Sequence, residues 1–284
     1  MATLVCFHAH PDDEAISTGG LMAQAAAAGH RVVLVVATRG EHGEPVAGIL
    51  KTGEELADRR VAETHRSAVV LGVDRLHFLG YVDSGMMGTT TNDDPGCFWQ
   101  ASIEEAAERL APLLRTEQAA VLTIYDEWGT YGHPDHIQVH RVGRRAAELA
   151  GMNPHQVFCA TANRDRLQRL QELIPRDATA EGVSSDAADR LPDLETLGVP
   201  EEMITHAVDV AEFADRKRLA MEAHASQISP DDFFLRMPLD SFRQAFGTEW
   251  FVCLGAPRLP GEPFLSELFA PAPGPGPGRG DESK

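Results

Sequence analysis

The chain has 284 residues, of which 43% are hydrophobic, so it can bury the core of one large α/β domain or of one domain with a smaller appendage. Its formal charge is −18, from 25 lysines and arginines against 43 aspartates and glutamates. This excess of acid argues against DNA, RNA or an anionic membrane surface as the main partner. We expect a neutral or cationic small molecule instead, and the oligomeric state stays open, a homo-oligomer included.

The N-terminal segment, the absence of long apolar windows and the cysteines lead us to expect a cytoplasmic protein. No basic stretch precedes a hydrophobic region near the N-terminus, and no apolar window approaches 18 residues, so we expect neither a secretory signal nor a membrane span. The four cysteines (Cys6, Cys97, Cys159 and Cys253) are scattered and form no CxxC pair. We interpret them as buried, reduced thiols.

Apolar runs typical of strands alternate with helix-like stretches through the first half of the chain. We predict strands at residues 3–8, 31–37, 75–78, 120–124, 156–160, 205–209 and 250–254, and helices at 20–28, 53–71, 101–116, 136–151, 164–174 and 211–224. This alternation predicts a Rossmann-like α/β fold, with a mostly parallel sheet covered by helices on both faces and a small C-terminal α+β portion. Ligands of such sheets bind at the carboxyl ends of the strands.

Composition divides the chain into three parts. We expect residues 1–175 to form the catalytic domain and residues 176–270 to complete it and cover the site. Within the second part, residues 178–200 are rich in Ala, Ser, Asp and Gly, and we interpret them as an insertion or a mobile loop over the site. Residues 271–284 form a Pro/Gly tail that cannot bury a core, so we expect it to be disordered.

A polar hexapeptide, AHPDDE, directly follows the first predicted strand. It gathers one imidazole and three carboxylates, which are costly to desolvate without a cation, so a divalent metal is the simplest explanation. His10 and Asp13 are the candidate ligands, because the proline between them imposes an extended entry that lets both side chains face one point. Asp12 is the candidate general base and then general acid. Glu14 is expected to hydrogen-bond neighbouring backbone or a ligand.

A second polar cluster, YGHPDH, comes shortly after the fourth predicted strand. Two of its histidines stand three positions apart at the start of a predicted helix, so one can bind the metal while the other faces the substrate. We assign His136 as the ligand and His133 as the stabiliser of a tetrahedral oxyanion, provided that His133 is protonated, a state in which Asp135 could hold it. Tyr131 is a candidate second donor to the same oxygen. His140, one turn later, is an alternative third histidine.

Each assignment competes with a plainer one. A histidine at a strand end is more often structural than a ligand, Asp12 can cap a helix, and Tyr131 can be a packing aromatic. The small residues after the first cluster give a tight turn but no GxGxxG fingerprint, so we do not predict a nucleotide site or a nucleotide-dependent oxidoreductase.

The two clusters resemble the motifs of the N-acetylglucosaminyl-phosphatidylinositol de-N-acetylase (PIG-L/LmbE-like) family. Within the family they are most similar to the mycothiol branch, which contains N-acetylglucosaminyl-inositol deacetylase and mycothiol S-conjugate amidase. The resemblance covers about residues 3–255. Further similar segments are TRGEHGE at 38–44, RVAE at 60–63 leading to LGV at 71–73, YVDSGMMG at 81–88 with FW at 98–99, and AHASQ at 223–227.

The resemblance implies a Rossmann-like enzyme that uses zinc to hydrolyse acetamides of amino sugars. It implies His10, Asp13 and His136 as metal ligands, Asp12 as the base, His133 as the oxyanion stabiliser and Tyr131 as a mobile tyrosine that assists at the carbonyl. Arg60 and Asp83 match positions that hold sugar or inositol hydroxyls. For Arg60, the alternative is a surface pair with Glu63. Val82 and His42 depart from the mycothiol deacetylase pattern near the expected substrate rim, which leaves the exact substrate open.

We therefore predict a metal-dependent deacetylase of an N-acetylglucosamine-containing small molecule. Two substrate alternatives keep the same chemistry: a mycothiol S-conjugate, or an amino-sugar intermediate of natural-product biosynthesis. A third alternative is a metal- or sugar-binding protein without catalysis, against which the presence of Asp12, His133 and Asp135 argues. The sequence does not choose among zinc, iron(II), cobalt and manganese, all of which a His₂Asp site accepts.

Overall fold

A computed structural model describes residues 1–173 and 194–269 of the protein. The predicted tail at 271–284 lies outside the described residues, and so does most of the predicted loop at 178–200. The expected division into parts ending at residues 175 and 270 stays a prediction. No helix of the described residues is long and apolar enough to span a membrane.

The described residues form a seven-stranded sheet with the order β3-β2-β1-β4-β5-β7-β6. The strands are β1 (Thr3–His8), β2 (Arg31–Val36), β3 (Arg75–Phe78), β4 (Ala119–Tyr125), β5 (Val157–Thr161), β6 (His206–Asp209) and β7 (Thr248–Cys253). Strands β1 to β5 pair in parallel, whereas β7 is antiparallel to both β5 and β6. All seven predicted strands are confirmed, as is the mostly parallel α/β class.

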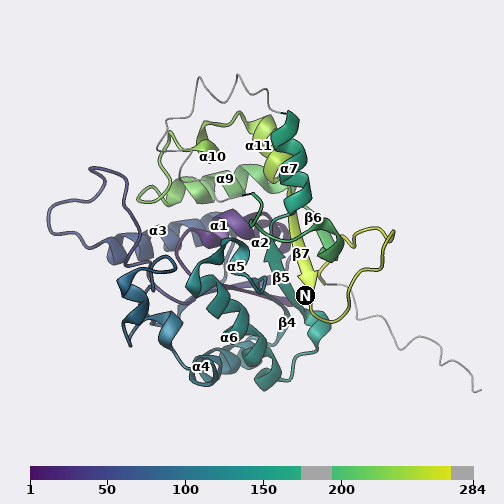
Figure 1. Ribbon diagram of the computed structural model, residues 1–284, viewed down its shortest axis with the longest axis horizontal. Helices are drawn as coiled ribbons and strands as arrows, with labels where there is room; N and C mark the ends of the chain where they lie inside the picture. The colour runs from purple at the N-terminus through teal and green to yellow at the C-terminus, as the bar shows by residue number, and fades with distance from the viewer. Residues whose placement is uncertain (174–193, 270–284) are drawn as a thin grey trace, which may run out of the picture.

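Helices cover both faces of this sheet (Figure 1). They are α1 (Asp13–Ser17), α2 (Gly19–Ala27), α3 (Leu56–Leu71), α4 (Ile103–Thr116), α5 (Gly129–Gly132), α6 (Pro134–Ala150), α7 (Arg164–Leu173), α9 (Ala214–Ala223), α10 (Phe233–Arg236) and α11 (Leu239–Phe246). Alternate residues of β1 face opposite ways. Leu4 and Cys6 pack in a core with α2 and α9, while Val5 and Phe7 pack in a second core with α4 and α6.

Four short helices were not predicted: α1, α5, α10 and α11. Each has eight residues or fewer, which is shorter than the window of roughly 11–18 residues over which apolar periodicity distinguishes a helix. Helix α1 begins immediately after Asp12, inside the polar hexapeptide. The predicted helix at 20–28 is therefore preceded by one further turn, and this turn carries Asp13 and Glu14.

The C-terminal strands are joined to the first half of the chain by more than backbone pairing. Lys217 of α9 and Glu249 of β7 form an ion pair of 2.6 Å in which both side chains are 2% exposed. Glu249 also accepts the backbone N–H groups of Gly20 and Leu21 at the start of α2. A buried charge is stable only with such partners, so this carboxylate fixes α2, α9 and β7 together. All four cysteines are buried and unpaired, as expected.

Candidate metal centre

The sheet brings the two polar clusters together. Strands β1 and β4 are parallel neighbours, so the segments that leave their carboxyl ends meet at one edge of the sheet. The first segment enters α1, and the second enters α5 and α6. His10, Asp13, His133 and His136 are all buried there, with exposed fractions of 2–7%.

Of the three predicted ligands, the two histidines both lie close to the third, Asp13. Its Oδ2 lies 3.4 Å from Nδ1 of His10 and 3.3 Å from Nε2 of His136. Donors bound tetrahedrally to zinc at about 2.0–2.1 Å are separated from one another by about 3.3–3.4 Å. The spacing and the N and O chemistry of the donors therefore fit a zinc-like metal.

The second ring nitrogen of His10 faces carboxylates. Its Nε2 lies 3.1 Å from Oδ2 of Asp135 and 3.4 Å from Oδ1 of Asp83. Asp135 is held in turn by Ser84, whose backbone N–H donates to Oδ2 at 2.9 Å and whose hydroxyl donates to Oδ1. A carboxylate that accepts the Nε2–H of a histidine leaves Nδ1 free to bind a metal. The contacts of Asp135 thus assign Nδ1 as the metal-facing atom of His10.

The described residues contain two metal-capable groups that share His10. One consists of His10, His133 and His136, and the other of His10, Asp83 and Asp135. Asp13 belongs to neither, although its Oδ2 lies between the two predicted histidine ligands. We retain it in the ligand set because it supplies a negative charge at tetrahedral spacing. Burial raises the pKa of Asp13, but His136 and His10 outweigh burial and hold that pKa well below its usual range.

His133 differs from its predicted state. Burial, followed by the neighbouring His10 and His136, lowers its pKa to about 2, so the ring is neutral. Its Nδ1 accepts the backbone N–H of Asp135 at 3.1 Å, which places the ring proton on Nε2. The expectation of a protonated His133 held by the Asp135 carboxylate is corrected: that carboxylate faces Ser84 and His10. A neutral His133 still offers one N–H donor.

Asp12 occupies an unusual backbone conformation beside the donors. Its φ is 101°, a region that non-glycine residues rarely adopt and that typically costs about 1–3 kcal/mol. Its backbone N–H donates to Oε2 of Glu14 at 3.0 Å, and its Oδ2 lies 3.3 Å from the Arg60 guanidinium. Burial raises the pKa of Asp12 to about 6, although Arg60 opposes the rise. Glu14 thus bonds neighbouring backbone, as expected.

Arg60 lies under the site, not on the helix surface. It is 4% exposed, and its guanidinium donates to the carbonyls of Pro11 and Gly40. Glycines at 40 and 43 make room for it, since an added Cβ at either position would come within 2.4 Å of its Nη1 atom. The alternative of a surface pair with Glu63 is therefore wrong. The Nε atom of Arg60 has no partner among the described residues.

Asp83 and Tyr131 also reach the site. Asp83 accepts N–H groups from His42 and Gly85, in addition to facing His10. The Tyr131 hydroxyl lies 3.3 Å from Nε2 of His136, while 37% of the residue is exposed. Tyr131 therefore borders both the donors and the solvent. His140, the alternative ligand, instead bonds the Tyr125 carbonyl through Nδ1 at 2.9 Å.

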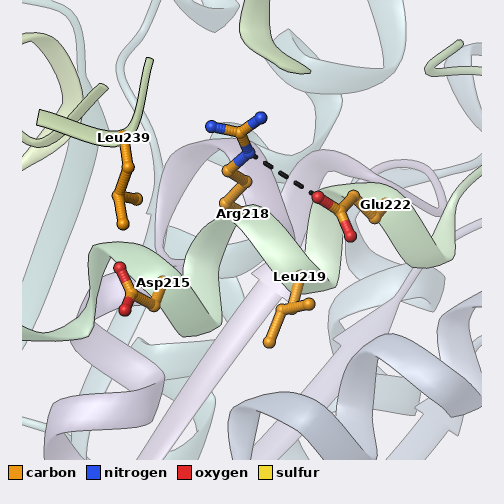
Figure 2. Close-up of a pocket in the computed structure, with 5 residues that line it drawn as sticks. All are labelled: Asp215, Arg218, Leu219, Glu222 and Leu239. Carbon is orange, nitrogen blue, oxygen red and sulfur yellow. Dashed lines mark ion pairs between the residues drawn. The ribbon is translucent and has the colours of Figure 1, made fainter. Parts of the chain in front are cut away.

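Sequence reasoning missed two contributions to the site. Ser84 anchors Asp135, and His224 bonds Glu14 at 2.6 Å from 210 residues away. Both lie in segments that resemble the family, YVDSGMMG and AHASQ, which was the available signal. A separate surface hollow on α9 is lined by Asp215, Arg218, Leu219, Glu222 and Leu239 (Figure 2), and none of the predicted site residues borders it.

The fold and the site define an α/β protein with a buried, metal-capable His/Asp group at the carboxyl edge of its sheet. The family model for PIG-L, GlcNAc-PI de-N-acetylase, matches residues 5–147. The chain belongs to this family of de-N-acetylases. The family resemblance inferred from the two motifs is thereby confirmed.

Relatives match over nearly the whole chain. A 1D-myo-inositol 2-acetamido-2-deoxy-alpha-D-glucopyranoside deacetylase of Acidothermus cellulolyticus is 38% identical over 279 residues, which cover 94% of this chain and 94% of that protein. The deacetylase of the same name from Nocardiopsis dassonvillei is 40% identical, and the match covers 93% of this chain and 98% of that protein. The N,N'-diacetylchitobiose deacetylase from Pyrococcus horikoshii shares the fold, with a TM-score of 0.57, 21% identity and coverage of 89% of this chain and 84% of that one.

Proposed function

We propose that the protein is a zinc-dependent de-N-acetylase that hydrolyses the acetamide of an N-acetylglucosaminyl-inositol-like small molecule to a free amine and acetate. The observation that carries the proposal is the spacing of the His10, Asp13 and His136 donors with Asp12 beside them. Support for the substrate class comes from the relatives in Acidothermus and Nocardiopsis, whose names specify an acetamido-glucopyranoside of inositol.

A metal ion would be held by His10 Nδ1, Asp13 Oδ2 and His136 Nε2. When bound, it would polarise the acetamide carbonyl and lower the pKa of a bound water toward ~7. Zinc suits this donor set, and iron(II) or another divalent metal is accepted by the same chemistry. Asp135 contributes by keeping the proton of His10 on Nε2, away from the metal-facing nitrogen.

The proton transfers belong to Asp12. Its carboxylate accepts a proton from the attacking water and delivers it to the amine nitrogen as the C–N bond breaks. Arg60 holds the carboxylate in place through its contact with Asp12 Oδ2. His133 donates its Nε2–H to the developing oxyanion, and Tyr131 donates its O–H from the solvent side of the site.

Substrate hydroxyls would be bound by Asp83 and by Arg60, whose Nε–H has no partner among the described residues but is buried, so surrounding side chains would have to shift for a hydroxyl to reach it. Asp83 is suited to this task because it borders the donors and is itself fixed by the backbone of His42 and Gly85. The amine would then be released next to a carboxylate-rich edge, which favours its protonated form. We place the protein in the cytoplasm, in keeping with its free thiols.

Amine release from a substrate panel tests the proposal. The panel contains N-acetylglucosaminyl-inositol, a mycothiol S-conjugate and a further N-acetylglucosaminide, each assayed with chelated and with zinc-reconstituted protein. We expect zinc-restored release from N-acetylglucosaminyl-inositol, and none from the Asp12→Ala variant. Release only from the S-conjugate or only from the other sugar would contradict the proposed substrate. Absence of release from every member, with zinc bound, would contradict the enzymatic proposal itself.

A further inference from the structure

A buried hydrogen-bonded chain links the C-terminal part of the protein to Asp12. His224 follows the last residue of α9, and its side chain is fully buried. Its Nε2 lies 2.6 Å from Oε1 of Glu14, in α1. Helices α1 and α9 pack directly against each other, which brings these residues together although they are far apart in sequence (Figure 1).

The Glu14 carboxylate contacts both His224 and the backbone of Asp12. One carboxylate oxygen, Oε1, accepts from His224 and from the Ser67 hydroxyl at 2.5 Å. The other, Oε2, accepts the backbone N–H of Asp12 at 3.0 Å. Two side-chain donors therefore fix Oε1 of the carboxylate, and Oε2 holds the backbone of Asp12. Because Glu14 is fully buried, it has no water to replace a donor that is lost.

Asp12 needs such a support because its backbone is strained. With φ at 101°, the segment would relax to an ordinary conformation unless surrounding groups held it. The hydrogen bond from the Asp12 N–H to Glu14 joins the strained residue to α1 and, through His224, to α9. We infer that His224 is a positioning residue that, through Glu14, holds Asp12 in the conformation needed for proton transfer. This inference rests on the proposed function of Asp12.

The contact geometry of His224 suggests a matched pair of variants. Its Nε2 bonds Glu14, whereas its Nδ1 has no hydrogen-bond partner among the described residues. The terminal amide nitrogen of glutamine reaches the place of Nε2, but that of asparagine reaches only the place of Nδ1. His224→Gln therefore keeps a donor to Glu14, and His224→Asn removes it while leaving a polar side chain of similar kind.

Steady-state kinetics and crystal structures of the metal-loaded variants test the inference. For His224→Asn we expect kcat to fall about 10- to 100-fold with KM and zinc affinity within about threefold of wild type, since the partners of catalytic groups typically have effects of this size. For His224→Gln we expect kcat within about threefold of wild type. The crystal structure of His224→Asn should show that the hydrogen bond from the Asp12 N–H to Glu14 is broken and that φ of Asp12 has changed.

Equal losses in the two variants, or an unchanged Asp12 backbone in His224→Asn, would overturn the inference. If His224→Asn does not fold, Ser67→Ala provides the second test, because it removes the other donor to the same Glu14 oxygen. It should lower kcat with KM unchanged, and an unaltered kcat would count against the chain. Wild-type protein that turns over no substrate would contradict the proposed function, while the crystal structures would still decide whether His224 positions Asp12.

Discussion

Replacing Asp135 with asparagine tests whether this residue tunes the metal-facing nitrogen of His10. The asparagine carbonyl can take the place of Oδ2 and accept both the His10 Nε2–H and the Ser84 N–H. Its amide can then donate to the Ser84 hydroxyl, which has lone pairs to accept. The contacts of His10 are preserved, and the changes are the loss of one negative charge beside His10 and of the acceptor for the Ser84 hydroxyl proton.

The expected loss of zinc affinity follows from the weakening of the hydrogen bond between His10 Nε2–H and residue 135. A hydrogen bond to a charged acceptor contributes about 1.5–3 kcal/mol and a neutral one about 0.5–1.5 kcal/mol. The difference of about 1–1.5 kcal/mol corresponds to a zinc affinity roughly tenfold lower, at the lower end of the usual effect of such partners. The change should appear in the dissociation constant and leave the folded state intact.

Competition with a chromophoric chelator at fixed pH measures the zinc affinity directly. The matched control is Glu63→Gln, because Glu63 accepts the N–H and hydroxyl of Ser226 much as Asp135 accepts those of Ser84, but contacts no proposed ligand. We expect the control to bind zinc as wild type does. A loss of less than twofold in Asp135→Asn, or an equal loss in both variants, would refute the reasoning.

Three further predictions concern catalysis and stability. Asp12→Ala should lower kcat at least 100-fold and keep zinc bound, as stoichiometry and kinetics will show; retention of more than about a tenth of the wild-type rate would contradict the base assignment. Lys217→Met should lower the free energy of unfolding, measured in urea, by about 3 kcal/mol, because Glu249 keeps its charge but retains only its two backbone donors. The double variant Lys217→Met/Glu249→Gln should recover much of this free energy. Burial lowers the pKa of His206 to about 4, so the folded state resists protonation and loses stability as pH falls from about 6.5 to about 4. In His206→Gln the unfolding free energy should decline less over that range, and an unchanged slope would count against this source of pH dependence.

Much of the fold could be predicted because buried strands leave a strong local signal. Each predicted strand is a short apolar run between turn residues, and all seven are found. Each polar cluster follows a predicted strand, so a parallel sheet places both at its carboxyl edge, and the structure adds that the two strands, β1 and β4, are neighbours. Helices as short as α10 and α11 span too few residues to be told from a loop by sequence, and tertiary packing decides them.

The fine structure of the site could not be predicted in the same way. The contacts of Asp135 depend on which oxygen Ser84 reaches, and the neutral state of His133 depends on burial beside two other imidazoles. The pairs Glu14–His224 and Lys217–Glu249 join residues 210 and 32 positions apart. No local pattern encodes such distances, because the partners meet only once the helices have packed.

Titration of metal-free protein with zinc, followed by amine release from N-acetylglucosaminyl-inositol, tests the central claim most directly. The account predicts that activity rises linearly and saturates at one zinc per chain, and that Asp13→Ala and His136→Ala neither bind this equivalent nor recover activity. Full activity of the metal-free protein, or a zinc equivalent bound with wild-type affinity by both variants, would contradict the account.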